Sequence, residues 1–170
     1  KQKLALSCAL IHKPRVLFLD EPTTGVDAVS RQEFWEMLRR LKRSGITIVV
    51  STPYMDEAGL CDRVALMQGG HVLGIDAPAA LSSRFTRRLF AIRAPERFRL
   101  MQTLRAYPHA YSVYAFGESL HYTDTRPDAR PADLLAYLAD HGVGEAHVAP
   151  IAAGIEDVFM ALMDEHREVT

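Results

Sequence analysis

The stretch VLFLDEPTTGVDA, residues 16–28, decides how the first part of the chain folds. Its first four residues form a short apolar run, which is typical of a parallel strand covered on both faces. Asp20 and Glu21 follow this run directly, at the edge of a parallel sheet where ligands bind. One carboxylate there could hold Mg²⁺ through water while the other orients an attacking water, so the pair predicts a site for phosphoryl transfer. The structural alternative is that the two acids only begin the next turn.

The residues after this stretch complete a strand-helix-strand unit. Residues 28–45, AVSRQEFWEMLRRLKRSG, repeat Phe34, Leu38 and Leu41 on one helical face and end at Gly45. The next apolar run, ITIVVST, predicts a second buried strand. A strand, a helix of about four turns and another strand predict parallel pairing with a right-handed connection. After a short helix in YMDEAGLC, residues 64–76 predict a hairpin around Gln68-Gly69-Gly70.

From residue 86 the pattern of elements changes. It predicts a strand at 87–93, a helix at 96–107, strands at 111–116 and 118–124, a helix at 131–141, a strand at 145–149 and a helix at 154–167. The order β-α-β-β-α-β is the ferredoxin-like pattern. The predicted core faces of the first two helices are Phe98, Met101 and Leu104, and Leu134, Leu135 and Leu138. We therefore expect two domains, at residues 1–85 and 86–170.

Composition excludes several classes of protein. The formal net charge is -1 and 48% of the residues are hydrophobic, as in ordinary soluble domains. Neither half is basic enough to predict binding to nucleic acid. Cys8 and Cys61 cannot form a disulfide framework, and both are predicted to be core residues. No segment reaches the ~20 apolar residues that a membrane span requires.

Several motifs together resemble the ATP-binding cassette (ABC) family. VLFLDEPTTGVD looks like the Walker B strand, catalytic glutamate and D-loop of that family. KQKLALSCALIHKP resembles the helix after the signature motif, and STPYMDEAGLCDRVALMQGGHVLGIDAP resembles the switch loop and the strands after it. The match covers about the first 85 residues in unbroken order. The resemblance implies an α/β fold with a partial P-loop-type parallel sheet and flanking helices, followed by a small ferredoxin-like α+β domain.

The resemblance also implies roles for individual residues. Asp20 would support Mg²⁺ through water, and Glu21 would be the general base or the group that positions water. Asp27 would reach across a dimer to the nucleotide site of a second cassette. The helix that begins at Lys1 would have the signature loop at its N-terminus, where backbone N–H groups face a γ-phosphate. Residues 86–170 resemble, more weakly, the C-terminal accessory domain of export-type ABC ATPases, and imply a docking or regulatory role.

Two departures from the family pattern bear on activity. The sequence contains no G-x-x-x-x-G-K-[ST] motif, so the P-loop, glutamine loop and signature loop are expected before residue 1. We expect that this piece alone binds no ATP appreciably and is inactive. Second, the family has a histidine that contacts the γ-phosphate at the position of Pro53. Proline has neither a side-chain donor nor a backbone N–H, although Thr52 could cap a helix that starts at Pro53.

Three functions follow as hypotheses. The first is an ATPase subunit of an ABC exporter, with ATP and Mg²⁺ as cofactors, on the cytoplasmic face of the membrane. Its partners would be membrane-spanning subunits and a second cassette, and not nucleic acid. The second is a catalytically weak or regulatory cassette, which Pro53 favours. The third is a soluble ABC ATPase acting on DNA or ribosomes, although the coiled-coil insertions or basic linkers usual in such proteins are missing from this sequence.

Overall fold

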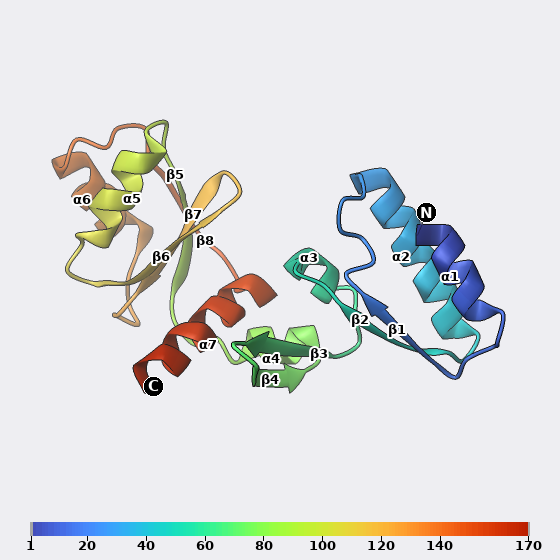
Figure 1. Cartoon of the computed structure of the whole chain (residues 1–170). Helices are drawn as coiled ribbons and strands as arrows, with labels where there is room; N and C mark the ends of the chain where they lie inside the picture. Colours follow the sequence, from blue (N-terminus) through green and yellow to red (C-terminus); the bar gives the residue numbers. More distant parts are fainter. Residues whose placement is uncertain (1, 170) are drawn as a thin grey trace. The chain divides into compact units, whose positions relative to one another are not determined.

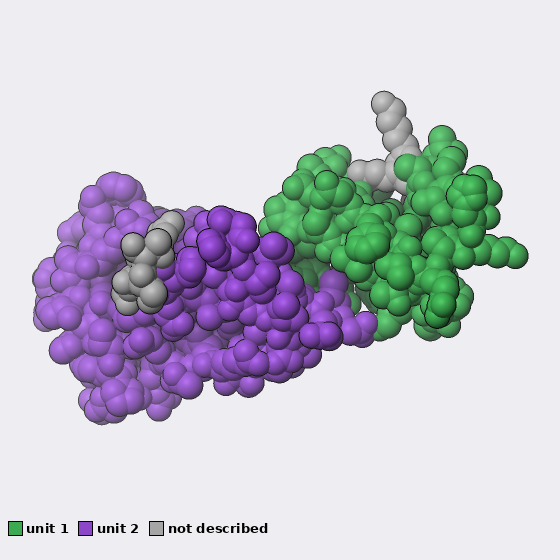
Figure 2. All heavy atoms as spheres, turned by 60° about the horizontal axis from the view of Figure 1, so that its bottom comes forward, with its two compact units in different colours: residues 1–60 green, residues 61–170 purple. Residues whose placement is uncertain are grey.

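The structure, a computed structural model, describes the backbone of residues 2–169 and the side chains of residues 4–166 (Figure 1). Its contacts divide the chain into two compact units, residues 1–60 and 61–170 (Figure 2). The domain boundary expected between residues 85 and 86 remains a prediction. The fold is mixed α/β with small sheets, so the two units are described in turn.

The first unit contains the predicted strand-helix-strand segment. Its elements are α1 (Gln2–Leu10), β1 (Val16–Asp20), α2 (Ala28–Arg43), β2 (Thr47–Ser51) and α3 (Met55–Ala58). The strands β1 and β2 pair in parallel, with Val16 opposite Thr47 and Asp20 opposite Ser51. Parallel pairing predicted from the pattern is thus confirmed, and both strands end at the same edge.

The sheet of the first unit is covered less completely than its apolar sequence predicted. Leu17 is buried with Phe34 and Trp35 of α2, whereas the Phe18 side chain is 75% exposed. Val16 and Val49 are exposed as well. The prediction that both faces of β1 and β2 are buried is therefore wrong for the described residues. Successive side chains of a strand point to opposite faces, so one face of this sheet is apolar and open.

The second unit begins with an antiparallel hairpin, β3 (Val64–Gln68) and β4 (His71–Asp76), as predicted. The short helix α4 (Pro78–Ser83) follows it, and the last helix, α7 (Ile155–Val169), packs against α4 and β4. Gly74 of β4 faces the side chains of Leu81 on α4 and Leu162 on α7, and a methyl group here would make ordinary van der Waals contact with both. The hairpin is thus joined to the C-terminal helix.

A four-stranded antiparallel sheet forms the rest of the second unit. Its elements are β5 (Leu89–Arg93), α5 (Arg97–Arg105), β6 (Ala110–Phe116), β7 (Ser119–Asp124), α6 (Pro131–Asp140) and β8 (His147–Pro150). The strand order is β6-β7-β5-β8. One face packs on α5 and α6 and forms a hydrophobic core, with Phe90, Ile92, Leu100, Leu104, Val113, Leu120, Tyr122, Leu134 and Leu138 among its buried residues.

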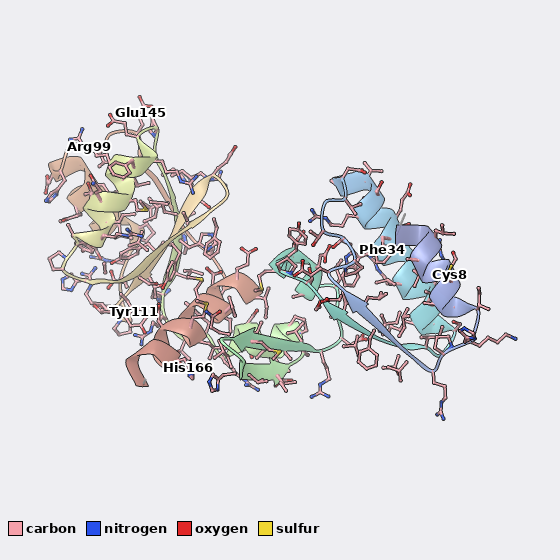
Figure 3. All side chains as sticks on the ribbon, viewed as in Figure 1. Cys8, Phe34, Arg99, Tyr111, Glu145 and His166 are labelled. Carbon is pink, nitrogen blue, oxygen red and sulfur yellow. The ribbon has the colours of Figure 1, made fainter. Side chains whose placement is uncertain are left out.

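Two predicted core residues of these helices are exposed. Phe98 is 68% exposed and Leu135 is 38% exposed, whereas Leu100 and Leu104, and Leu134 and Leu138, are buried at a spacing of four. The predicted core face of α5 is therefore confirmed at Leu104 and, by packing against the core, at Met101, and is wrong at Phe98. Cys8 on α1 is also exposed, contrary to the prediction for both cysteines, and Cys61 is partly buried (Figure 3).

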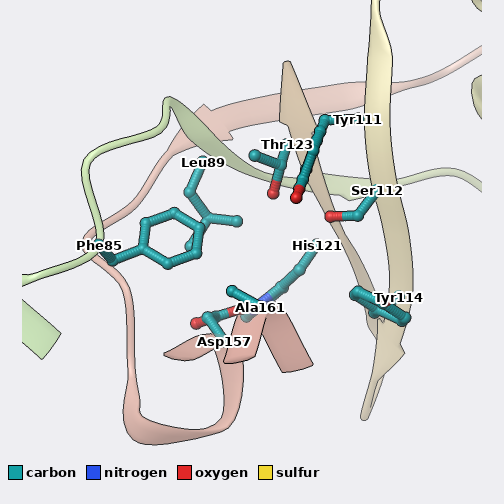
Figure 4. A pocket seen from close by; sticks show the side chains of 9 residues that line it. All are labelled: Phe85, Leu89, Tyr111, Ser112, Tyr114, His121, Thr123, Asp157 and Ala161. Atoms are coloured by element: carbon teal, nitrogen blue, oxygen red, sulfur yellow. Dashed lines mark hydrogen bonds and ion pairs between the residues drawn. The ribbon is translucent and has the colours of Figure 1, made fainter. Parts of the chain in front are cut away.

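The opposite face of the four-stranded sheet receives α7 through polar contacts. His121 Nδ1 lies 2.6 Å from Asp157 Oδ1, and Asp157 Oδ2 accepts the N–H of Gly154 at 2.9 Å (Figure 4). Tyr114 donates its hydroxyl to Asp164. Because Asp157 is buried, its two partners fix both the start of α7 and its position on the sheet.

A buried ionic network lies at the end of β7. Asp124 accepts hydrogen bonds from the backbone N–H and Nε of Arg126, at 2.8 and 3.0 Å, and from the hydroxyl of Tyr122 at 2.8 Å. Burial raises the pKa of Asp124, but the hydrogen bonds from Arg126 outweigh it and hold that pKa below its ordinary value. Burial and the bond to Asp124 raise the pKa of Tyr122. The network satisfies polar groups beside the core.

Candidate functional site at the ends of two parallel strands

Asp20 is the last residue of β1 and is exposed. It is opposite Ser51, the last residue of β2. The Ser51 hydroxyl donates to Asp20 Oδ1, and both residues are exposed. The end of the strand is therefore open to a ligand and is not plugged by packed side chains.

Glu21 follows in an unusual backbone conformation. Its φ of +41° lies in the left-handed region, which few residues other than glycine adopt. Its N–H faces both the carbonyl and the hydroxyl of Ser51, at 3.0 and 3.1 Å. Thr24 donates its hydroxyl to Glu21 Oε2 at 3.1 Å. The carboxylate is thus oriented by a threonine one turn away while the residue stays exposed.

Asp27 has a role within the chain that was not predicted from the sequence. It is the N-cap of α2, and its Oδ1 accepts the N–H of Ser30 at 3.0 Å. This backbone hydrogen bond lowers the pKa of Asp27. Asp27 is exposed, so capping the helix leaves it on the surface.

Pro53 is exposed in the segment between β2 and α3. The helix begins at Met55, with Tyr54 as an N-cap that has no side-chain hydrogen bond. The prediction that Pro53 takes the first helical position with Thr52 as the cap is therefore wrong. Thr52 Oγ1 instead accepts the N–H of Tyr54 at 3.1 Å, which turns the chain before the helix begins.

A cluster of charged and aromatic side chains behind this segment was also not predicted. Glu57 is 1% exposed, and Thr52 donates its hydroxyl to Glu57 Oε2 at 2.7 Å. Arg31 of α2 lies 3.8 Å from Glu57 Oε1 and 3.5 Å from Asp56 Oδ2. Its guanidinium carbon lies 4.4 Å above the ring centroid of Tyr54. Arg31 and Asp56 are 25 residues apart in the sequence, so local sequence patterns do not predict this cluster.

The donor set at the strand ends suits a hard cation. Mg²⁺ is commonly bound by one or two carboxylates, waters and substrate phosphates. Asp20 supplies one exposed carboxylate, held by Ser51, and Glu21 stands beside it. Among the residues that the structure describes, no three His, Cys, Asp or Glu side chains form a cluster that could hold a metal by themselves. The residues present therefore fit a cation shared with a phosphate ligand.

Comparison with known proteins shows similarity along nearly the whole chain. It is 36% identical over 165 residues to the probable multidrug ABC transporter ATP-binding protein YbhF of Escherichia coli (strain K12), covering 96% of this chain and 28% of that protein. It is 36% identical over 164 residues to the Nod factor export ATP-binding protein I of Burkholderia lata, covering 95% and 51%. The protein of that name from Bradyrhizobium diazoefficiens is 32% identical over 170 residues, covering 99% and 53%.

These relatives are ABC transporter ATP-binding proteins, and the chain spans between about a quarter and a half of their length. No family model matches the sequence. Among the described residues, no helix combines the length and the apolar character needed to cross a membrane.

Proposed function

We propose that this chain is part of the ATP-hydrolysing subunit of an ABC transporter that works as an exporter. The observation that carries the proposal is the register of β1 and β2, which brings Asp20, Glu21 and Ser51 together at one exposed edge. The similarity to ABC transporter ATP-binding proteins over 96% of the chain supports the same conclusion. Two of the relatives are named as export proteins, which supports an exporter.

Asp20 and Glu21 would have different roles, one in cation binding and one in proton transfer. Asp20, fixed by the Ser51 hydroxyl, would hold a Mg²⁺ ion through its water. The cation would neutralise charge on the phosphates of bound ATP. Glu21 would accept a hydrogen bond from the attacking water and take its proton. The bond from Thr24 to Glu21 Oε2 leaves the other carboxylate oxygen to face that water.

The complete protein would supply what this chain lacks. The open apolar face with Phe18, Val16 and Val49 fits a sheet that continues into other parts of a longer protein, because parallel sheets are covered on both faces. The greater length of the relatives supports this. A second cassette would meet the exposed Asp27 at a dimer interface, and membrane-spanning subunits would hold the protein on the cytoplasmic face of the membrane. We expect the chain alone to be inactive.

The second domain, residues 86–170 in our proposal, would be a ferredoxin-like accessory domain. The element order β-α-β-β-α-β and the strand order β6-β7-β5-β8 in an antiparallel sheet support this arrangement. No catalytic role is proposed for it. Its contacts through α7 to α4 and β4 support a docking or regulatory role.

The function is tested by ATP turnover of the complete protein with Glu21→Gln. Loss of the general base should lower turnover by about 10²–10⁴-fold while ATP binding is retained. The matched control is Glu36→Gln, an exposed carboxylate on α2, which should hydrolyse ATP at the normal rate. Equal turnover of the two variants would contradict the role of Glu21. Absence of ATP hydrolysis by the unaltered protein would contradict an enzyme at this site.

Pro53 supports a second candidate, a catalytically weak or regulatory cassette. Pro53 is exposed but offers neither a side-chain donor nor a backbone N–H that could bind a phosphate. Loss of one donor to a transition state costs about 10²–10³-fold in rate. If this candidate is right, Pro53→His in the complete protein should raise turnover by a measurable part of that factor. Unchanged turnover would count against a weak site limited by Pro53.

A further inference from the structure

We propose that Arg31 and Glu57 are positioning residues that couple the D-loop segment at Asp27 to the switch segment at Pro53. Neither residue stands at the strand ends, so each would act through its neighbours. The functional consequence of this coupling rests on the proposed ATPase activity, whereas the coupling itself is a property of residues 27–58. The two parts can be tested separately.

The buried carboxylate of Glu57 contacts both Thr52 and Arg31, and so links the two segments. Its side chain is 1% exposed. Glutamate is almost never buried to this degree unless it is paired, so the partners of this carboxylate matter. One oxygen accepts the Thr52 hydroxyl at 2.7 Å, and Thr52 Oγ1 also accepts the N–H of Tyr54 at 3.1 Å. The hydroxyl of Thr52, the residue before Pro53, therefore binds two groups that follow Pro53 in the chain. The backbone at residue 53 is set by the position of the Glu57 carboxylate.

Arg31 brings α2 to the same carboxylate. Its Nε lies 3.8 Å from the other oxygen of Glu57, and its guanidinium covers the ring of Tyr54 at 4.4 Å. The planar guanidinium can pair with carboxylates and stack on an aromatic ring at the same time, which lysine cannot do. Arg31 thus contacts Tyr54, which directly follows Pro53, and the two acidic residues of α3, Asp56 and Glu57. A shift of α2 would move that segment with it.

Arg31 is also tied closely to Asp27. The two residues are one helical turn apart, and the N–H of Arg31 donates to the carbonyl of Asp27 at 2.9 Å. Asp27 caps this first turn through Ser30. A change at Asp27, such as contact with a second cassette, would therefore reach residue 53 through one rigid turn of helix and one buried ion pair. These are contiguous packed groups, and double-substitution cycles measure whether they are coupled.

The coupling is tested by amide hydrogen exchange on the 170-residue chain, without nucleotide. Arg31→Met should raise the exchange rate of the amides of Tyr54, Glu57 and Ala58 by about tenfold, because the buried carboxylate loses its cation. Arg40→Met, an exposed arginine on the same helix, is the matched control and should leave these rates unchanged. Amides that join β1 to β2 serve as the reference for unfolding of the whole unit.

Three further variants make the test specific for the ion pair. Glu57→Gln retains an acceptor for Thr52 and removes only the charge, so it should raise the same rates if the ion pair matters. Adding Arg31→Met to Glu57→Gln should then have little further effect. Arg31→Lys should give rates between those of the unaltered chain and Arg31→Met. Equal exchange in Arg31→Met and Arg40→Met, or additive effects in the double variant, would overturn the coupling.

The functional consequence is measured in the complete protein. Arg31→Met should lower ATP turnover at saturation by more than about tenfold, with the KM for ATP within about twofold, because Arg31 positions the segment and touches no substrate. Normal turnover would overturn the positioning role. If the unaltered protein hydrolyses no ATP, the proposed function fails, and the exchange experiment still decides whether the residues are coupled.

Discussion

The parallel sheet of the first unit and the four-stranded sheet of the second unit differ in where their charged residues lie. The four-stranded sheet of the second unit buries its ionic groups: Asp124 lies against Arg126 and Tyr122 beside a complete core. The two-stranded sheet of the first unit instead leaves Asp20 and Glu21 exposed at its end and one apolar face open. Buried carboxylates with full sets of partners serve stability, whereas exposed, oriented carboxylates at a strand end remain available for a ligand.

The largest expected effect on stability lies in the core of the second unit. Leu104 is fully buried between α5 and the sheet, so Leu104→Ala should cost about 2–5 kcal/mol through lost burial and a cavity. Urea denaturation followed by far-ultraviolet circular dichroism measures the change. The control is Leu135→Ala on α6. Leu135 is 38% exposed, so this substitution should lower the free energy of unfolding much less. Equal losses of unfolding free energy in the two variants would contradict the burial of Leu104 in the core of the second unit.

The next effect concerns the buried network and depends on pH. Asp124→Asn removes charged acceptors for Arg126 and should cost about 1.5–3 kcal/mol at pH 7. The folded protein holds the pKa of Asp124 below its unfolded value of about 3.9. Its contribution is therefore complete above about pH 4 and is lost as the pH falls through the folded pKa. Denaturation at several pH values should show a shallower acid dependence for Asp124→Asn, and an unchanged slope would contradict this.

A smaller, local effect is expected at the start of α7. Asp157→Ala removes the acceptor for Gly154 N–H and the partner of His121, which should cost about 1–2 kcal/mol. Exchange of the α7 amides should become faster while the amides of α5 and α6 keep their protection. Uniform loss of protection across the unit would show that Asp157 supports the whole fold and not the docking of one helix.

The smallest effect should come from the open face of the first unit. Phe18 is 75% exposed, so Phe18→Ala should change the stability of the chain by less than about 0.5 kcal/mol. The single tryptophan, Trp35, is buried in this unit, and its fluorescence reports unfolding there. In the complete protein we expect the same substitution to cost about 3–5 kcal/mol, because the face would be covered. A large cost in the chain alone would contradict the open face.

The sequence predicted those features that depend on local order. The strand-helix-strand unit and the carboxylates at its edge follow from an apolar run, a helical repeat and two adjacent acids. Phe98 was misassigned because it lies three residues before Met101, as Met101 does before Leu104, and the sequence alone does not say which side of the helix faces the sheet. The open face at Phe18 could not be predicted, since an apolar run does not reveal how many of its faces are covered.

The cluster around Glu57 shows a different limit. The partners of Glu57 are Arg31 of α2 and Thr52, which follows β2, and these groups meet only because of how the chain between them folds. The sequence showed Asp56 and Glu57 only as acids early in a short helix. Helix capping by Asp27 was predictable from its position before the helical repeat, because aspartate is a favoured N-cap residue.

The central claim is that a cation shared with a nucleotide lies at the end of β1, and iron-catalysed cleavage of the complete protein tests it most directly. With Fe²⁺ in place of Mg²⁺, ATP, ascorbate and peroxide, the backbone should be cut near Asp20–Glu21 and near Ser51–Pro53, and excess Mg²⁺ should suppress both cuts. Mass spectrometry of the fragments locates them. Cleavage near Gly45, beyond the opposite end of β2, with none at the strand ends would contradict the claim.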